Sequence, residues 1–518
     1  MRVSTCMNTG IQAARARVAI GQAARISSTL ATSTASVASD SSPTRSQCAA
    51  DPQWPVIESA RSQPVHLMDG QNRRVILGVS GGVDSAVSAL ILKERGFQVE
   101  AAFMRNWDSS TEADTQGPCP LDKDREDARE VCRLLDIPFH EVDFVKEYWL
   151  DVFQQFLDGY AAGITPNPDI LCNRSVKFGS FADWVSQHFD GAMIATGHYA
   201  QVATSPLAPG SHFLERAVDR HKDQTYFLSA IQPGILARTL FPVGGFHKAE
   251  VRRLAALAHV GDYTGLRAAL GQVTASTNAE YAPTGRNTFD PSASHPGYFG
   301  PGAHSPVTGS PALPESVLNR HESMGICFIG KRDFAPFLEQ YLELKPGPFL
   351  DLETGLPLPG KPQHTGAAAY TVGQSARIGG QQKKWFVARK DTRTNSVYLV
   401  PGHDHPRLLA SYVEVDRPSV AATPATILDG PLHWLTERHH VPGLGAIGPP
   451  CHVYAQYRHA IGAQVPAALG LSGSESPARV EFSQPVFAPA PGQQLAVYCP
   501  ANRICLASSV IARFGQTD

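Results

Sequence analysis

The most regular pattern in the chain is an alternation of short apolar runs and amphipathic stretches between residues 75 and 196. Residues 75–79 form an apolar run that ends in Ser-Gly-Gly, and apolar positions at helical spacing follow as far as Gly96. The same reading gives further strands over 99–104, 139–144 and 193–196, and a helix over 124–135. Strands that alternate with helices predict an α/β domain with a parallel sheet and helices on both faces.

The alternation stops near residue 260. Between residues 283 and 314 Gly, Pro, Ser, Ala and His dominate, and such a segment has few apolar residues for a core, so a disordered insertion is expected over about 260–320. Short β-like runs bounded by turn residues then appear over 385–388, 396–400, 480–482 and 495–498. They predict two small β-rich domains, over 331–406 and 407–518, after an α/β domain over 72–330.

The N-terminal region has a different composition. Residues 1–39 hold four arginines and no acidic residue, and they are rich in Ser, Thr and Ala. This composition is typical of an organelle transit peptide. It predicts a disordered transit peptide over residues 1–45 and a mitochondrial location, and an ordinary disordered tail is the alternative.

Charge and cysteine content narrow the class of protein. The net charge of the 518 residues is -2, so a nucleic acid would have to bind to a local basic patch. Residues 361–393 hold seven basic side chains and one acid, Asp391, although a solvated strand face explains them equally well. The nine cysteines include no C-x-x-C pair, which indicates a reducing compartment. No apolar run is long enough to span a membrane, so no membrane partner is expected.

The strongest motif is the Ser-Gly-Gly-Val-Asp-Ser turn between the first strand and the first helix. Glycines let the backbone close around an anion, and the amides at the helix start, with the Ser80 and Ser85 hydroxyls, are able to bind phosphate. No lysine follows the glycines, so this is not a Walker A loop. The turn is similar to the pyrophosphate loop of enzymes that cleave ATP between its α and β phosphates. The predicted ATP-binding residues of this turn are Gly78, Val79, Ser80, Gly81, Gly82, Val83, Asp84 and Ser85.

Two further segments carry cysteines in unusual surroundings. In residues 165–173, Thr-Pro-Asn-Pro-Asp-Ile-Leu-Cys-Asn, two prolines fix the backbone, and Asp169 and Cys172 are three residues apart, on one face of any helical turn that begins there. Downstream, Cys327 lies in an apolar run bounded by Gly325 and Gly330. Taken alone, each cysteine is more often a small buried hydrophobic residue than a reactive thiol.

Together, these motifs resemble the tRNA 2-thiouridylase family over residues 73–512, apart from the insertion. The resemblance also rests on Ala195-Thr-Gly-His-Tyr-Ala200 and Lys222-Asp223-Gln224. It implies a Rossmann-like ATP pyrophosphatase domain of the PP-loop type, with Cys172 as nucleophile, Cys327 as carrier of a persulfide and Asp169 beside the target base. It adds Met104 and Gly197 as walls of the ATP site. The tRNA-binding residues that it implies are Asn167, Pro168, Asp169, Lys222, Asp223, Gln224, Gln456 and Tyr457.

The family's reaction defines the expected cofactors and partners. ATP, with Mg²⁺, would adenylate the 2-carbonyl of the wobble uridine of a tRNA, and a persulfide supplied by a cysteine desulfurase or a relay protein would then deliver sulfur. In an alternative form, Asp169, Cys172 and Cys327 ligate an iron–sulfur cluster that carries the sulfur. Two rival functions are an ammonia-using synthetase of the same superfamily, which leaves the cysteine pair unexplained, and a silent tRNA-binding protein.

The chain departs from the family pattern at three places that concern tRNA or lid contacts. Gln456 replaces the first arginine of an Arg-Tyr-Arg element, which puts one phosphate contact in doubt. Residues 322–324 read Glu-Ser-Met where Asp-Ser-Thr is usual, and residues 375–377 lack the usual Arg-Lys pair. The three side chains expected to be catalytic are all present.

Overall fold

The computed structural model describes eleven stretches of the chain. They are residues 59–65, 68–108, 120–206, 208–280, 313–320, 328–329, 332–415, 451–459, 464–470, 478–499 and 501–516. The transit peptide predicted over 1–45, the middle of the insertion and Cys327 lie outside the described residues.

The first part of the chain alternates strands and helices as the sequence predicted. Its elements are β1 (Arg61–Ser62), β2 (Arg74–Val79), α4 (Val83–Glu94), β3 (Gln98–Arg105), α5 (Pro120–Leu134), β4 (Phe139–Asp143), α6 (Val145–Tyr148), the π-helix η4 (Trp149–Phe153), α7 (Gln154–Ala162), α8 (Pro168–Cys172), the π-helix η5 (Asn173–Ser180), α9 (Phe181–His188), β5 (Met193–Thr196), β6 (Ala200–Ser205), β7 (Ala208–Arg216), α10 (Thr225–Leu228), α11 (Pro233–Leu236), β8 (Thr239–Leu240), α12 (Lys248–His259), α13 (Tyr263–Glu280) and α14 (Glu315–Leu318).

The second part is mostly β-structure. Its elements are α15 (Phe334–Glu339), β9 (Gly347–Asp351), β10 (Gln363–His364), the 3-10 helix η6 (Ala367–Ala369), β11 (Trp385–Asp391), β12 (Ser396–Pro401), the 3-10 helix η7 (Pro406–Leu408), β13 (Leu409–Val415), β14 (Cys451–Gln456), β15 (Gln464–Gly470), β16 (Ala478–Phe487), β17 (Gln494–Tyr498) and β18 (Cys505–Gly515).

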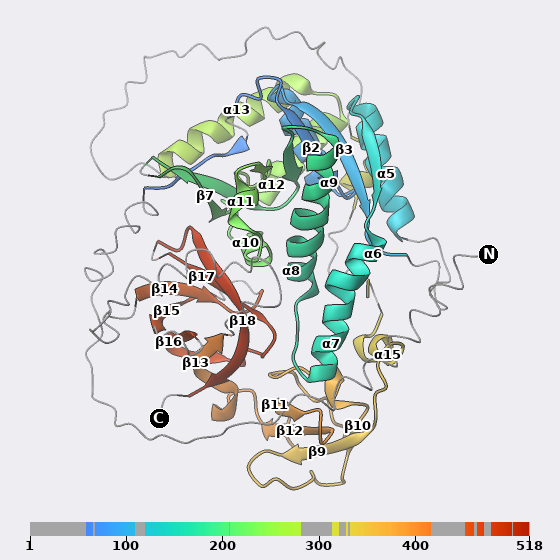
Figure 1. Ribbon diagram of the computed structural model, residues 1–518, viewed down its shortest axis with the longest axis vertical. Helices are drawn as coiled ribbons and strands as arrows, with labels where there is room; N and C mark the ends of the chain where they lie inside the picture. The colour runs from blue at the N-terminus through green and yellow to red at the C-terminus, as the bar shows by residue number, and fades with distance from the viewer. Residues whose placement is uncertain are drawn as a thin grey trace, which may run out of the picture.

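The α/β domain is built on a five-stranded parallel sheet in the order β4-β3-β2-β5-β8. The central strand β2 is a nearly continuous apolar run because both of its faces are covered, whereas the edge strand β4 is mostly polar. One face packs against α4, α5, α12 and α13, and the other packs against α6 to α9 (Figure 1). The chain order reverses on the two sides of β2, so the carboxyl ends of β2 and β5 flank the switch point where ligands bind in open α/β sheets.

The disordered insertion predicted over about 260–320 includes ordered residues at both of its ends. Residues Tyr263–Glu280 form the helix α13, and Leu266 and Leu270 on it are buried in the same core as α4 and α12. After the gap in the described residues, Leu313 and Val317 are fully buried in that core as well. The prediction of disorder was therefore wrong for these two flanks, because their apolar positions at helical spacing bury against α12 and α4.

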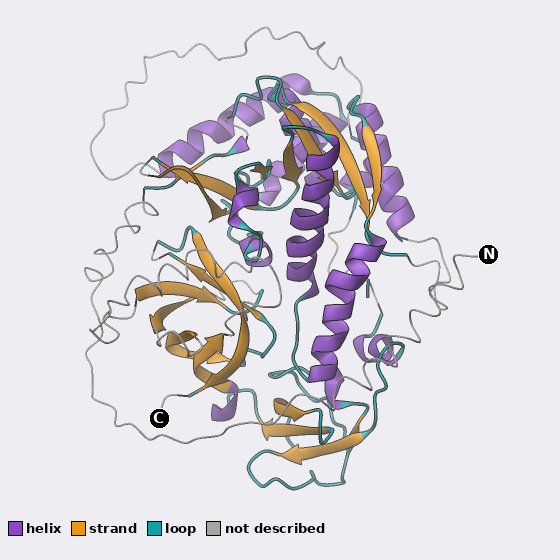
Figure 2. Cartoon of the chain, viewed as in Figure 1, coloured by secondary structure: helices purple, strands orange, loops and turns teal. Residues whose placement is uncertain are grey.

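The two β-rich domains have different architectures (Figure 2). The first is a four-stranded sheet in the order β10-β9-β12-β11, and the second is a closed barrel in the order β13-β16-β15-β14-β17-β18. A separate three-stranded sheet, β1-β6-β7, lies between the parallel sheet and the barrel. The Arg503 guanidinium of the barrel donates to the Ala60 carbonyl just before β1, at 2.7 Å. The barrel is thus joined to the α/β domain by polar contacts as well as apolar ones.

Candidate active site

The turn over residues 80–85 has the backbone shape expected of an anion-binding element. Gly81 has φ of +72°, and a Cβ at this position would lie 2.3 Å from the Asp124 carbonyl oxygen, so the turn requires glycine. Gly82 is the N-cap of α4 and provides no side chain that caps the helix. The first amides of α4 therefore face the turn without a side-chain acceptor, which is the usual arrangement of a phosphate site.

The side chains of the turn divide between structure and binding. The Ser85 hydroxyl donates to the Gly82 carbonyl at 2.9 Å and accepts from the Ser80 amide at 3.3 Å, so it fixes the shape of the turn. Ser85 is only 5% exposed, whereas Ser80 is exposed. Val79 and Val83 point into the core and can offer a ligand only their backbone.

Three more predicted ATP-site residues gather at this turn. A Cβ on Gly197 would lie 2.8 Å from the Ser85 amide nitrogen, so the loop after β5 approaches the turn as closely as two backbones can. A Cβ on Gly78 would lie 3.0 Å from the Met104 terminal methyl carbon. Gly78 and Met104 thus contact each other between β2 and β3, and Gly197 contacts the turn.

Asp84 is held by residues that the sequence reading missed. The Lys248 ammonium, at the start of α12, lies 2.7 and 2.8 Å from the two Asp84 carboxylate oxygens. The Tyr199 hydroxyl donates to the same carboxylate at 2.8 Å. The Lys248 backbone amide donates to Asp219 at 2.9 Å. The Lys248 cation thus pairs with the carboxylate of this loop, although it comes from a helix 164 residues away.

A second cation reaches the turn from α14. One nitrogen of the Arg320 guanidinium donates to the Gly81 carbonyl at 3.0 Å, and the group also forms ion pairs with Asp124 and Asp127. The Ser316 hydroxyl donates to Asp127 at 2.7 Å. The segment after the insertion thus returns to fix the turn on the side of α5.

The predicted Asp169–Cys172 helical turn exists as α8. The Asn167 side chain caps it by accepting from the Asp169 and Ile170 amides at 3.1 and 3.3 Å, and Pro168 occupies the first helical position, where its missing N–H costs nothing. Cys172 ends α8 and is 6% exposed within the apolar cluster between the sheet and α7. The chain then enters the π-helix η5, a type of helix that is frequent at functional sites.

Asp169 has electrostatic surroundings that suit proton transfer. Burial raises the pKa of the Asp169 carboxyl above its ordinary value, while the charges of Lys177 and His459 oppose this shift. Lys177 also lies 3.5 Å from the Nε2 atom of His198, the residue after Gly197. Burial, followed by the charge of Lys177, holds the pKa of His198 well below its usual range, so this ring is neutral at pH 7. Lys177 connects the Asp169 carboxyl with the wall of the ATP site.

The residue directly after Cys327 is buried in the core of the α/β domain. Cys327 itself is outside the described residues, but Phe328 is 1% exposed and belongs to the same apolar cluster as Cys172. The Phe328 ring lies 5.1 Å from the rings of both Phe153 and Phe156, between centroids. Of this apolar run, Phe328 and Ile329 are described, and both are buried in a turn.

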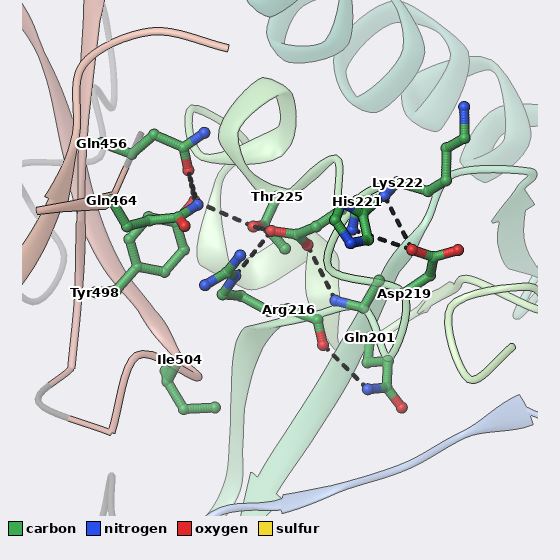
Figure 3. A network of polar contacts seen from close by, with 12 residues as sticks. Gln201, Arg216, Asp219, His221, Lys222, Thr225, Gln456, Gln464, Tyr498 and Ile504 are labelled. Atoms are coloured by element: carbon green, nitrogen blue, oxygen red, sulfur yellow. Dashed lines mark hydrogen bonds and ion pairs between the residues drawn. The ribbon is translucent and has the colours of Figure 1, made fainter. Parts of the chain in front are cut away.

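The segments expected to contact tRNA are partly engaged inside the protein (Figure 3). The Asp223 carboxylate pairs with Arg216 at 2.9 Å and accepts from the Thr225 hydroxyl at 2.9 Å. Thr225 in turn lies 3.1 Å from the Tyr498 hydroxyl, which donates to Gln456 at 3.2 Å. Asp223 and Gln456 thus join the α/β domain to the barrel, and direct tRNA contact through their side chains remains a prediction.

The neighbouring residues of these segments are placed differently. The Gln224 side chain accepts from the Tyr199 amide at 2.8 Å, which ties it to the residue that holds Asp84. Tyr457 is 4% exposed, beside the ring of Phe482, whereas Lys222 is partly exposed. Of these three, Tyr457 is buried, and Gln224 and Lys222 are both partly exposed.

Two general features bear on cofactors and partners. Among the residues that the structure describes, no group of three or more His, Cys, Asp and Glu side chains is placed to hold a metal ion. No helix in the described stretches is both long and apolar enough to cross a membrane.

The basic patch predicted over 361–393 keeps most of its cations exposed, but Lys390 is turned inward, with its ammonium 2.6 Å from the Tyr370 carbonyl oxygen.

Comparison with known proteins assigns all three parts of the chain. Family models described as a tRNA methyl transferase HUP domain, a tRNA methyl transferase PRC-barrel domain and an aminomethyltransferase beta-barrel domain match residues 73–264, 335–401 and 426–511. The human mitochondrial tRNA-specific 2-thiouridylase 1 is 36% identical over 465 residues, which cover 86% of this chain and 91% of that protein. The tRNA-specific 2-thiouridylase MnmA of Enterococcus faecalis is 34% identical over 457 residues, 87% of this chain and 98% of that protein. A solved 4-thiouridine synthetase–RNA complex with bound ATP aligns with 36% of this chain and 40% of its own, at a TM-score of 0.21 and 16% identity.

Proposed function

Because the chain belongs to the tRNA-specific 2-thiouridylase family, we propose that it replaces the 2-oxygen of the wobble uridine of tRNA with sulfur, using ATP. One observation carries the proposal. The anion-binding turn 80–85 and the helix that bears Asp169 and Cys172 belong to one α/β domain and are bridged by Lys177 and His198. A nucleotide site beside a thiol site fits a reaction in which ATP activates the base and a cysteine-bound sulfur then attacks the activated carbon.

ATP fits the turn as a substrate. The amides at the start of α4 and the Ser80 hydroxyl would bind the diphosphate that leaves, and Lys248 would balance its charge beside Asp84. Mg²⁺ is usually held by substrate phosphates with one or two carboxylates, so a dedicated protein cage is not required. Asp84, the carboxylate of the turn, would be the residue available to hold the ion, which would spread the negative charge of the transferred group.

The uracil 2-carbonyl needs activation because its oxygen is a poor leaving group. The carbonyl oxygen would attack the α phosphorus of ATP, diphosphate would leave, and the base would carry an AMP group on that oxygen. To reach the site, the base must be extruded from the anticodon stack. Asp169, whose carboxyl pKa is raised by burial, is suited to exchange a proton with the base, since a general acid or base works best with a pKa nearer to the operating pH.

Sulfur transfer would then use both cysteines. The terminal sulfur of a Cys327 persulfide attacks C2, the C2–O bond breaks, and AMP leaves with its electrons. The Cys172 thiolate attacks the Sγ atom of Cys327, so the 2-thiouridine is released and a Cys172–Cys327 disulfide forms. An external thiol reductant must reduce this disulfide before the next cycle. The burial of Phe328 in the same cluster as Cys172 supports a short path between the two sulfurs.

The proposal extends to location and sulfur supply. The arginine-rich, acid-free residues 1–39 and the relatives named as mitochondrial enzymes support a mitochondrial form. The persulfide on Cys327 requires a donor, for which a cysteine desulfurase or a relay protein has the appropriate chemistry.

The test uses the two cysteines separately. After incubation with a cysteine desulfurase system, mass spectrometry should find an added sulfur on the Cys172→Ser protein at Cys327 and none on the Cys327→Ser protein, because a hydroxyl cannot form a persulfide. Both variants should still release diphosphate in the presence of tRNA, because adenylation needs neither thiol, and make no 2-thiouridine from persulfide. Sulfur added at Cys172 in the Cys327→Ser protein would reverse the two roles.

The same proteins distinguish the competing schemes. Visible absorbance bands of an iron–sulfur cluster in anaerobically purified wild-type protein, lost in either cysteine variant, would replace the persulfide scheme by the cluster scheme. AMP formation that needs ammonia and no tRNA would point to a synthetase. An absence of AMP formation in the wild type with every tRNA would leave a binding protein.

A further inference from the structure

His459 is a residue of the barrel that reaches the candidate active site of the α/β domain. It follows β14, and its ring lies 4.4 Å from the ring of Phe227 between centroids, with 41° between the ring planes. The His459 side chain is exposed and Phe227 is half-buried. The imidazole therefore packs against Phe227 at a tilt, and the exposed ring remains open to a ligand.

Phe227 is a firm support for this ring. It belongs to α10, and its carbonyl accepts a hydrogen bond at 3.0 Å from the side chain of Asn173, the residue directly after Cys172. The preceding Tyr226 is fully buried, and its hydroxyl donates to the Gln494 carbonyl at 3.0 Å. The Phe227–His459 pair is thus fixed to α8 on one side and to the barrel on the other.

The pair lies beside the Asp169 carboxyl. His459 is among the groups whose charge acts on Asp169, and Asp169 acts on His459 in return. Partial burial, which outweighs the attraction of Asp169 and Asp223, lowers the pKa of His459, so the imidazole is neutral at pH 7. A neutral aromatic ring with an open face suits a stacking contact better than an ionic one.

We propose that the open face of His459, supported by Phe227, is the stacking platform for the extruded base at Asp169, so the C-terminal barrel completes the base pocket. This inference rests on the proposed function, because it assumes a nucleobase as substrate. Extruded bases are commonly held between aromatic side chains, histidine included, and stacking tolerates any base because each has a π face. Specificity would then come from hydrogen bonds at Asp169 and Asn167.

The experiment compares three substitutions at His459 with respect to kcat/KM for tRNA in the thiolation reaction. Loss of one stacking contact weakens binding by about 5- to 100-fold, so His459→Ala should lower kcat/KM by that factor. His459→Phe should restore most of it, because a phenyl ring stacks. His459→Gln, which keeps hydrogen bonding and loses the ring, should behave as the alanine variant does. Rescue by Gln and not by Phe, or loss in all three variants, would overturn the proposal.

A matched control and a second measurement isolate the base. His188 is also exposed and stacks on an aromatic ring, that of Trp184, at 5.0 Å on α9, and His188→Ala should leave kcat/KM unchanged. Wild-type protein should bind a tRNA that lacks the wobble base more weakly than the intact tRNA, and this difference should be several-fold smaller in His459→Ala, in which only the hydrogen bonds to the base remain. A difference of unchanged size in His459→Ala would refute the platform. If wild-type protein makes no 2-thiouridine at all, the proposed function itself fails.

Discussion

The buried ion pair between Arg216 and Asp223 should be among the most sensitive points of the junction between the α/β domain and the barrel. The two side chains are 5% and 4% exposed, and their charged atoms are 2.9 Å apart. Asp223 also accepts from the Ala217 amide at 3.0 Å and from Thr225. Replacing Asp223 by Ala leaves the Arg216 guanidinium buried without its partner. The free energy of unfolding should therefore fall by about 3 to 5 kcal/mol.

The expected loss of unfolding free energy comes from the unpaired Arg216 charge and not from the attraction within the ion pair. Taking two ions out of water costs about as much as their attraction returns, so a double variant that removes both charges should recover most of the loss. We expect Arg216→Met with Asp223→Leu to be within about 1.5 kcal/mol of the wild type, since the two apolar side chains fill similar space. The coupling energy of this cycle is the quantity to measure.

The assay is urea unfolding followed by far-UV circular dichroism. Glu343→Ala serves as the control, because Glu343 pairs with Lys345 at 3.2 Å while both side chains remain 82% and 70% exposed; it should leave the midpoint unchanged. A loss below about 1 kcal/mol for Asp223→Ala would mean that water reaches the pair in solution, which would refute the reasoning. Weaker tRNA binding by Asp223→Asn with an unchanged midpoint would instead support the direct tRNA contact that the family resemblance implied.

Two further predictions follow from burial in other parts of the molecule. Desolvation lowers the pKa of Lys390 to about 8, so the unfolded chain binds the proton more tightly than the folded protein does. The free energy of unfolding should therefore rise by about 3 kcal/mol between pH 8 and pH 10.5. Lys390→Met should abolish this rise, and an identical pH profile in the variant would exclude Lys390 as its source. Deleting residues 283–312 should hardly change the unfolding midpoint. Extending the deletion to residue 318 should lower the free energy of unfolding by about 3 to 6 kcal/mol, because it removes the fully buried Leu313 and Val317. Equal midpoints for the two deletions would show that these residues do not pack in solution.

The parts of the fold that the sequence predicted are those governed by local rules. The run 75–79, the turn at Gly81 and the helix that follows appear where they were expected, because strand burial, a positive φ and an amphipathic period are all local. The same holds for the helical turn with Asp169 and Cys172, since Asn167 and Pro168 are residues that begin helices. The family resemblance, and not these local patterns, supplied the roles of the cysteines.

The parts that could not be predicted depend on contacts between distant segments. Nothing near Asp84 in the sequence indicates that Lys248 and Tyr199 hold its carboxylate, and nothing near Asp169 indicates His459. The helix α13 is a different case. Its apolar residues Tyr263, Leu266 and Leu270 have helical spacing, so the signal was present, but the Gly- and Ser-rich composition farther along obscured it.

The contact between Arg503 and the Ala60 carbonyl can form only late in the synthesis of the chain. The two residues are 443 positions apart, and ribosomes add about 5 to 20 residues per second. The first described segment must therefore wait on the order of 20 to 90 seconds for this partner during synthesis. Ala60 also packs in the barrel cluster, so its burial is equally delayed. Until residue 503 emerges, the segment that contains Ala60 is held by its pairing with β6 and not yet by the barrel, even after the parallel sheet has formed.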